Sequence, residues 1–397
     1  MALSSLATDY AGTRTRLFWL ALKASILTVL TLGFYRFWMK TRLRRFYWSA
    51  IRPGGVPLEY TGTGVEKLMG FLIAVVFLAF YIGVFNLILI FFSFSLLSTS
   101  FAAYLLSFVG IIPIFFYARY RARRYILART RWRGMRFGAE SAAWSYAWRA
   151  MLHWLATILT LGLLLPRQIF KLEKFRTDRT WYGNARFHQE GRWTMLLPVA
   201  KHYYFGLLIS LTSGVAGYFE PVALLTLTPA LVWLIIGFVH LNVQGFRLLT
   251  EHKRLNERIA FTSAPRTRRI LRIYALGNML VSAILFTLIV VIFVAIGFFL
   301  ATFGPGSFEG EFELVPSLGS GWRDQLVFIG FAIAYFSMFI LYSVLTQVFV
   351  TLPIMAHYAE TLQIEKPHLL GEIDQRDRDD MTEAEGFAEA LDIGAAI

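Results

Sequence analysis

The stretch TLGFYRFWMKTRLRR, residues 31–45, joins the end of an apolar run to a dense cluster of positive charge. A related stretch, TLGLLLPRQIFKLEK, occupies residues 160–174. Outward from both stretches, basic clusters alternate with apolar runs of the ~20 residues that a helix needs to cross a bilayer. Lys and Arg are retained on the cytoplasmic side of an inserted protein, so these clusters act as topology markers. The alternation predicts an all-α fold, that of a polytopic helical membrane protein.

The composition agrees with a membrane location. Hydrophobic residues make up 57% of the chain and charged residues 16%, whereas a soluble domain is roughly 45–50% apolar and 25% charged. The net charge of +14 would suit nucleic acid if it covered one face of a soluble fold. Because the cations are interleaved with apolar runs, we expect the membrane and its anionic phospholipids as partners, and no nucleic acid. The absence of Cys excludes disulfides, thiolate metal sites and Cys nucleophiles.

Charge also decides between two topologies. Six apolar runs are candidate spans, at 68–97, 99–118, 195–217, 221–245, 274–303 and 326–356. Two further segments, 17–38 and 142–166, carry internal charges. If both crossed fully, the basic clusters would alternate between the two sides, against the positive-inside rule. We therefore predict six full transmembrane helices plus two re-entrant or interfacial helices, with both termini cytoplasmic; eight full spans remain the alternative.

An internal repeat organises the chain. An offset of 129 residues carries Gly33 to Gly162 and Trp19 to Trp148, and such periodicity indicates duplicated structural units. The expected division is an N-terminal cytoplasmic segment (1–16), repeat unit 1 (17–136), repeat unit 2 (137–272), a C-terminal transmembrane hairpin (273–358) and an acidic cytoplasmic tail (359–397).

Candidate binding residues come from charges and breaks inside the apolar runs. Ionisable groups there are expensive and often functional, and glycine-interrupted runs in two corresponding halves point to a ligand site in transporters. The alternative is that the cations snorkel to the interface and the glycines are ordinary helix caps. The binding candidates are Lys23, Gly33, Arg36, Lys40, Arg149, His153 and Gly162.

Two further groups complete the list of candidates. Basic amphipathic stretches either bind lipid headgroups or only anchor the topology; the headgroup candidates are Arg42, Arg44, Arg45, Arg121, Arg123, Arg124, Lys171 and Lys174. Neutral amides within apolar runs often join neighbouring helices; these are Asn86, Asn278 and Gln347.

Catalytic patterns are weak in this sequence. Its seven histidines include no closely spaced helical pair with a carboxylate, the arrangement typical of zinc hydrolases. Phosphate-binding glycine loops and nucleophile elbows are also missing. We expect no catalytic residue, no metal and no cofactor, and therefore no enzyme.

The run Leu30–Trp38, the basic helix Lys40–Tyr47 and the segment Tyr60–Gly64 resemble the YjgN-like family of bacterial inner-membrane proteins. The closing residues 385–395 are similar to that family as well. In the second copy Leu163-Leu164-Leu165-Pro166 replaces the aromatic run, which is a departure from the pattern. The resemblance implies a multi-pass inner-membrane protein, from a family without an established activity.

The function that these patterns favour is a transporter or channel-like protein for a small, anionic solute, with the charged residues near its pathway. The alternative is a non-transporting membrane scaffold or lipid-binding protein whose basic helices bind anionic lipid or a partner protein. A polar cavity between the repeats would favour transport, and a sealed apolar core would favour the scaffold.

Overall fold

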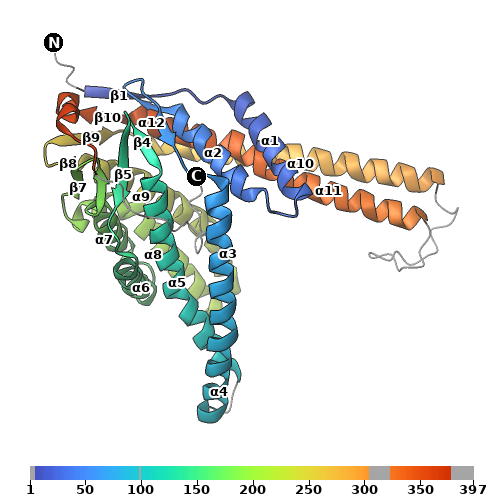
Figure 1. Ribbon diagram of the computed structural model, residues 1–397. Helices are drawn as coiled ribbons and strands as arrows, with labels where there is room; N and C mark the ends of the chain where they lie inside the picture. Colours follow the sequence, from blue (N-terminus) through green and yellow to red (C-terminus); the bar gives the residue numbers. More distant parts are fainter. Residues whose placement is uncertain (1–4, 98–99, 304–321, 377–397) are drawn as a thin grey trace. The chain divides into compact units, whose positions relative to one another are not determined.

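The structure is a computed structural model that describes residues 5–97, 100–303 and 322–376 (Figure 1). The expected turn near Ser98, most of the expected loop at 304–325 and the end of the acidic tail lie outside these ranges. The chain divides into two compact units. One, the ring unit, comprises Met1–Gly12, Lys40–Thr267 and Ala356–Ile397; the other, the helical unit, comprises Thr13–Met39 and Arg268–Met355.

Ten short antiparallel strands form one sheet in the ring unit. Their order is β2-β1-β10-β9-β8-β7-β6-β5-β4-β3, so strands consecutive in sequence pair with each other except β2 and β3, and β1 pairs with β10. The sheet is therefore a nearly closed ring, open only between β2 and β3. The strands are β1 Ser5–Tyr10, β2 Ile51–Pro53, β3 Leu58–Tyr60, β4 Thr130–Trp132, β5 Met135–Ala139, β6 Thr180–Tyr182, β7 Ala185–Gln189, β8 Lys253–Leu255, β9 Ile259–Ser263 and β10 Leu362–Glu365.

Tight turns with left-handed residues connect the strands. Gly54 and Gly55 follow β2 with φ of 60° and 77°, and Arg133 and Gly134 join β4 to β5 with φ of 50° and 79°. At Arg133-Gly134, two successive residues with positive φ form the two-residue hairpin turn that matches strand twist, whereas the turn at Gly54-Gly55 joins two strands that do not pair. Glycine at three of these four positions explains why the chain turns there.

The interior of the ring is an apolar core. Trp132, Tyr182, Ile259 and Ile364 are buried together. Tyr182 donates its hydroxyl to the Trp132 carbonyl at 3.1 Å, and burial raises the pKa of Tyr182 to about 12. Each large apolar side chain buried in this way contributes roughly 1.5–3 kcal/mol. The described part of the ring thus has a packed apolar core at its centre.

Helical segments leave the ring from one strand and return to the next along the chain. They separate β1 from β2, β3 from β4, β5 from β6, β7 from β8 and β9 from β10. The α-helices are α1 Arg14–Leu30, α2 Arg36–Ala50, α3 Gly64–Phe80, α4 Asn86–Leu97, α5 Ser100–Ala128, α6 Ala143–Leu159, α7 Leu165–Thr177, α8 Leu197–Phe219, α9 Leu227–Glu251, α10 Thr267–Phe303, α11 Trp322–Thr346 and α12 Leu352–Thr361. Shorter π or 3₁₀ segments are η1 Tyr81–Phe85, η2 Trp193–Leu196, η3 Pro221–Thr226, η4 Gln347–Thr351 and η5 Pro367–Glu372.

The predicted fold class is wrong in two respects. Within the described ranges, three helices are long and apolar enough to cross a membrane: Pro221–Glu251, Thr267–Ala295 and Phe328–Thr361. That is neither six full spans with two re-entrant or interfacial helices nor eight full spans. The ten-stranded sheet also excludes an all-α class. The three apolar helices do support an association with the membrane.

Local features account for both errors. The apolar run at 68–97 is divided by the π-helical turn η1, which leaves α3 with 17 residues and α4 with 12. The run at 195–217 becomes α8, whose first turns carry Lys201 and His202. The strands have only three to six residues and several carry Arg. For this reason their sequences were interpreted as parts of basic helices. The proposed division into two repeat units stays a prediction.

The helical unit is held together by α1, α10, α11 and η4. The guanidinium of Arg14 in α1 lies 5.8 Å from the centroid of the Phe349 ring in η4, within cation–π range. A Cβ at Gly277 of α10 would lie 2.8 Å from the Phe349 carbonyl oxygen. Glycine therefore lets α10 approach the backbone of η4 closely.

Residues after β10 close one side of the ring core. Leu370 and Ile373 join the apolar core. The chain then reaches the β6–β7 turn, where the Asn184 amide donates to the Asp374 carbonyl at 2.9 Å, and Arg136 donates its backbone N–H to Gln375 Oε1 at 3.0 Å. Part of the segment expected to be an acidic tail is therefore folded onto the ring.

Candidate functional site

The two Thr-Leu-Gly stretches form turns of the same geometry. Leu32 and Gly33 have φ of 51° and 93°, and Leu161 and Gly162 have φ of 50° and 93°. In each turn the glycine amide donates to a carbonyl five residues back, at 2.7 Å, and the leucine amide to one three residues back. These are the two bonds of a Schellman helix cap, in which the left-handed position is usually Gly. Here that position is Leu.

The threonine hydroxyl connects the two helices of each turn. Thr31 Oγ1 donates to Leu27 O at 2.7 Å and accepts the Tyr35 amide at 2.9 Å. Thr160 Oγ1 donates to Ala156 O at 2.8 Å and accepts the Leu164 amide at 3.3 Å. The shared motif thus has a physical cause: Thr bridges the helices, while Leu and Gly make the cap.

Helix α8 contacts the second turn, whereas the space around Gly33 in the first turn is open. Tyr203 donates its hydroxyl to Gly162 O at 3.2 Å, and Tyr204 donates to Leu163 O at 2.8 Å. A Cβ at Gly162 would collide with the Tyr203 hydroxyl, whereas a Cβ at Gly33 would meet no atom within 4 Å. The α6–turn–α7 segment, which we call the α6–α7 hairpin, is therefore locked to the ring unit.

Helix α6 has three different faces, as expected from its 3.6-residue periodicity. One face is buried against α5 and includes Tyr146, Ala147 and Ala150. A second face, about 140–180° around the helix from Trp144 at 100° per residue, carries Arg149 and His153. The third face is apolar and exposed, and consists of Trp144, Trp148, Leu152, Leu155, Ile158 and Leu159.

Cations of α7 lie near His153 on the second face of α6. Burial lowers the pKa of His153, and the nearby charges of Arg167 and Lys171 lower it further. Arg167 and Lys171 are both exposed, and neither forms an ion pair with another described residue. Arg149 lies with its guanidinium carbon 4.8 Å from the Phe175 ring centroid. We call His153, Arg167 and Lys171 the cation rim.

The other predicted binding residues do not belong to one constellation. Lys23 is exposed on α1 in the helical unit. Gly33 at its turn and Arg36 at the start of α2 belong to the same unit and are half-buried. Lys40 is half-buried in the ring unit. The structure thus brings His153 together with Arg167 and Lys171. Lys171 was predicted to bind lipid headgroups, and Arg167 was not among the predicted site residues.

A buried ion cluster lies on the other side of α7. Arg176 Nη2 is 2.8 Å from Glu173 Oε2, and Lys253 Nζ of β8 is 3.1 Å from Glu173 Oε1. Burial by itself would raise the pKa of Glu173, but Lys253, Arg176 and Arg123 outweigh it and hold this pKa well below its usual range. Burial lowers the pKa of Arg123. Sequence reasoning missed Glu173, because its partners come from distant segments.

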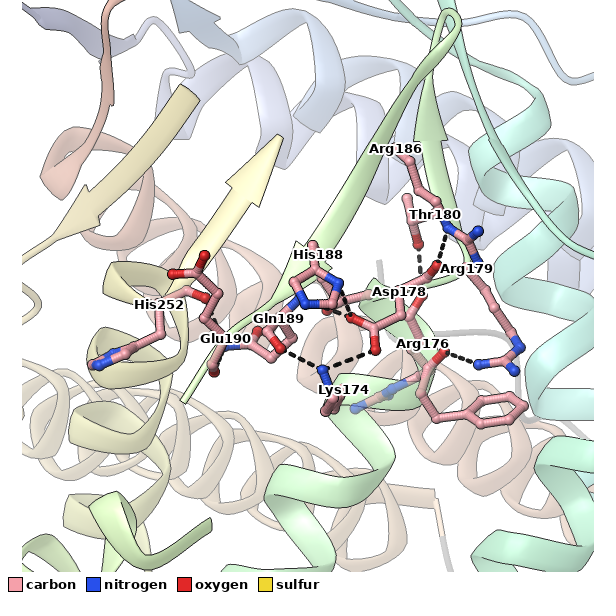
Figure 2. Close-up of polar contacts among 12 residues, drawn as sticks. Lys174, Arg176, Asp178, Arg179, Thr180, Arg186, His188, Gln189, Glu190 and His252 are labelled. Carbon is pink, nitrogen blue, oxygen red and sulfur yellow. Dashed lines mark hydrogen bonds and ion pairs between the residues drawn. The ribbon is translucent and has the colours of Figure 1, made fainter. Parts of the chain in front are cut away.

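A second carboxylate, Asp178, ties α7 to β7 (Figure 2). Lys174 Nζ lies 3.0 Å from Asp178 Oδ2 and donates to Gln189 O at 2.5 Å, while the Gln189 amide donates to Asp178 Oδ1 at 2.8 Å. The side-chain Nε2 of fully buried Gln189 donates to Leu249 O at 3.0 Å, at the end of α9. These contacts join α7, α9 and the sheet into one polar scaffold.

The buried carboxylate predicts an acid-sensitive fold. Because the folded-state pKa of Glu173 is depressed, its stabilising contribution is complete above the unfolded-state pKa of 4.5 and is lost as the pH falls toward the folded-state value. The difference in unfolding midpoint between the native protein and Glu173→Gln should therefore be constant from pH 7 to 5 and shrink between pH 4.5 and 2. Urea unfolding in detergent measures it. A pH-independent difference would contradict the charged state assigned to Glu173.

Several predicted headgroup residues instead have partners in the protein. Arg44 is only 3% exposed, with Nη1 3.2 Å from the Tyr60 hydroxyl. Arg45 donates to Gly62 O at 2.9 Å, Arg121 to Tyr117 at 3.2 Å, Arg123 to Thr180 at 3.4 Å and Arg124 to Ala139 O at 3.1 Å. Arg42 is exposed and Lys174 binds Asp178. Arg44, Arg123, Arg124 and Lys174 therefore attach helices to strands.

The three amides predicted to join neighbouring helices, Asn86, Asn278 and Gln347, lie in three different settings. Asn278 donates its Nδ2 to Tyr274 O of its own helix at 2.8 Å. Gln347 is the first residue of the π-helical turn η4. Asn86 begins α4, and its side chain lies outside the described part of the structure. Within the described ranges, no group of three or more His, Asp and Glu residues could hold a metal ion.

Comparison with known proteins places the chain in a family. A family model, bacterial protein of unknown function (DUF898), matches residues 5–298. This range contains β1 to β9, both Thr-Leu-Gly turns and the cation rim. No curated protein and no solved structure matches the chain. The YjgN-like resemblance is to this same family and is confirmed. The chain belongs to the DUF898 family of bacterial proteins.

Proposed function

We propose that the protein is a non-catalytic, non-transporting scaffold of the bacterial inner membrane whose α6–α7 hairpin binds anionic phospholipid headgroups. Three apolar helices support the membrane location, and the bacterial family supports the organism class. The ring unit would then present its surface to partner proteins on the cytoplasmic side.

One observation carries the lipid-binding part of this proposal: the α6–α7 hairpin carries both an exposed apolar face on α6 and, on another side, the cation rim. Trp148 and Leu152 are exposed on that face, and Arg167 and Lys171 are exposed on α7. α6 has 17 residues, which at 1.5 Å per residue is about 26 Å, short of the ~30 Å hydrocarbon core. A short helix with an apolar face and adjacent cations suits the headgroup boundary, where it attracts anionic lipid.

The pairing of the first and last strands supports a location of both ends of the described chain on the same side of the membrane. β1 and β10 are hydrogen-bonded neighbours, with Leu6 opposite Ile364. Segments paired in one sheet lie on one side of a bilayer, because an open sheet edge does not occur in its hydrocarbon region. The many Arg residues that join the helices to this sheet favour the cytoplasmic side under the positive-inside rule.

Transport of a small anionic solute is the competing function, since the same cations could attract a free anion. Trp132, Tyr182 and Ile364 pack together in the centre of the ring, and this apolar core supports the scaffold. Uptake of a radiolabelled anion, such as phosphate, into proteoliposomes above the level of empty vesicles would contradict the non-transporting part of the proposal.

Lipid binding is tested with fluorescent phosphatidylglycerol and the detergent-purified full chain. The double variant Arg167→Gln/Lys171→Gln should bind this lipid about 30-fold more weakly, because each cation near an anionic surface contributes ~1 kcal/mol. Fluorescent phosphatidylcholine should bind both proteins equally weakly.

A charge-matched control is Arg52→Gln/Arg258→Gln, which removes two other exposed cations of the ring unit. Its affinity for phosphatidylglycerol should stay within about twofold of the native value. If both double variants lose affinity equally, the binding is a general effect of net charge and the hairpin has no special role.

A further inference from the structure

The turn of the α6–α7 hairpin ends in an exposed apolar tip. Ile158, Leu159, Leu161 and Leu163 form this tip, and Leu161 is 63% exposed. Leu161 also occupies the left-handed position of the helix cap, with φ 50°. A β-carbon makes that conformation unfavourable, and glycine or asparagine is the usual solution. An exposed leucine there gains nothing from core packing that would offset the conformational cost.

The equivalent turn in the helical unit has the same property. Leu32 has φ 51° and is 92% exposed, and its neighbours Leu30 and Phe34 are exposed as well. Two turns of matched geometry thus present leucine outward at the least favourable backbone position. Exposed apolar clusters of this kind mark surfaces that contact another apolar phase or partner.

Helix α8 indicates which apolar phase covers the second tip. The hydroxyls of Tyr203 and Tyr204 bind the carbonyls of Gly162 and Leu163. The next residues of α8 begin an exposed apolar stripe that includes Phe205 and Leu208. α8 in turn packs along α9, which lies within the candidate membrane span Pro221–Glu251. The tip is therefore level with the start of an exposed apolar stripe on α8, and tyrosine is a residue typical of the boundary between water and lipid.

We propose that the tip of the α6–α7 hairpin, Ile158–Leu163, inserts into the acyl-chain region of a single leaflet. The proposal rests on the membrane location in the proposed function and goes beyond headgroup binding by assigning the occupant of the tip: lipid acyl chains. Arg167 lies five residues after Gly162 and limits the insertion to the shallow part of the leaflet, because its guanidinium stays among the headgroups.

The chain has no cysteine, so single labels can be placed without background. A fluorescent label at Leu161→Cys is compared in phosphatidylcholine vesicles with labels at Arg258→Cys, exposed on the turn before β9, and Val215→Cys, exposed on the apolar part of α8. Quenchers are lipids with a nitroxide near the top of the acyl chain, and aqueous iodide. The Leu161 label should be quenched at least threefold more by the nitroxide lipid than the Arg258 label, and should be shielded from iodide as the Val215 label is. A Leu161 label that resembles the Arg258 label in both assays would overturn the proposal.

A second variant separates insertion from misfolding. Leu161→Asn keeps a residue that tolerates the left-handed position but removes its apolar side chain. A label at Leu159→Cys in this background should lose at least half of its nitroxide quenching, while the Val215 label keeps its own. If the Leu159 label is unaffected, the tip is not held by acyl chains.

The experiments distinguish a failure of tip insertion from a failure of the proposed headgroup binding. Insertion is driven by apolar burial and should occur in vesicles of neutral phosphatidylcholine, where headgroup charge contributes nothing. A tip that inserts while phosphatidylglycerol binding is unchanged by Arg167→Gln/Lys171→Gln would retain this inference and overturn the headgroup assignment. Selective phosphatidylglycerol binding with a water-exposed Leu161 label would retain the headgroup assignment and overturn the insertion of the tip.

Discussion

Replacement of Glu173 by Gln should destabilise the ring unit by about 3–5 kcal/mol, the usual cost of removing one partner from a buried ion pair. The side chain of Glu173 is largely buried between Arg176 of α7 and Lys253 of β8, with Arg123 of α5 nearby. The amide is nearly isosteric with the carboxylate, so packing is preserved. What changes is that three cations lose the anion that compensates them.

Urea unfolding in mild detergent, followed by Trp fluorescence, measures this loss. The matched control is Glu251→Gln, which removes the exposed ion pair between Glu251 and Arg247 on α9. Exposed pairs of this spacing contribute about 0.5 kcal/mol or less. Equal destabilisation by the two variants would mean that Glu173 does not organise the junction of α7 with the sheet.

The second large effect concerns Gly162. Gly162→Ala should destabilise the α6–α7 hairpin by about 3 kcal/mol or more, because φ of 93° is unfavourable for any residue with a β-carbon and the new methyl group would collide with the Tyr203 hydroxyl. Gly33→Ala has the same φ but an open surrounding, so it should cost only the conformational part, roughly 1 kcal/mol. The difference between the two losses of stability measures the contribution of the contact between residue 162 and Tyr203 of α8.

A compensating change tests that assignment. In Gly162→Ala/Tyr203→Phe the hydroxyl that collides is absent, so the double variant should be more stable than Gly162→Ala alone. Tyr203→Phe alone should cost about 1 kcal/mol for its lost hydrogen bond. Thermal unfolding of the four proteins forms a double-mutant cycle. An additive cycle would show that Tyr203 and Gly162 do not interact.

The sheet could not be predicted from the sequence for a definite reason. A strand such as Thr130-Arg131-Trp132 has three residues, too few for an alternating pattern to stand out from its basic surroundings. Its partners, β3 and β5, are set by register and not by composition. Long apolar runs were visible, but the π-helical turn at Tyr81–Phe85 that divides one of them had no signal in the sequence.

The candidate site was partly visible. The offset between Gly33 and Gly162 located two turns whose backbone angles agree within a few degrees. Arg149 and His153 were correctly placed on one face, since four residues are close to one helical turn. The tyrosines of α8 that fix the second turn lie 41 residues further along the chain, and no local pattern connects them to it.

The charges were the least predictable element. Arg44 and Arg45 are adjacent in sequence, yet one is buried beside Tyr60 and the other binds Gly62 O from an exposed position. Lys171 and Lys174 are three residues apart, and only Lys174 reaches Asp178. Which cations face lipid and which tie helices to strands depends on the long-range sheet. Without the sheet, all of them could only be assigned to the headgroups.

The central claim is that the α6–α7 hairpin contacts anionic lipid. Its most direct test is a photoactivatable benzophenone label at Trp148→Cys, in vesicles of equal parts phosphatidylglycerol and phosphatidylcholine, with mass spectrometry of the adducts. Trp148 is exposed on the apolar face of α6. The account predicts lipid adducts in which phosphatidylglycerol exceeds phosphatidylcholine at least threefold, with the excess lost in Arg167→Gln/Lys171→Gln. Adducts in the bulk lipid ratio, or no lipid adducts, would contradict it.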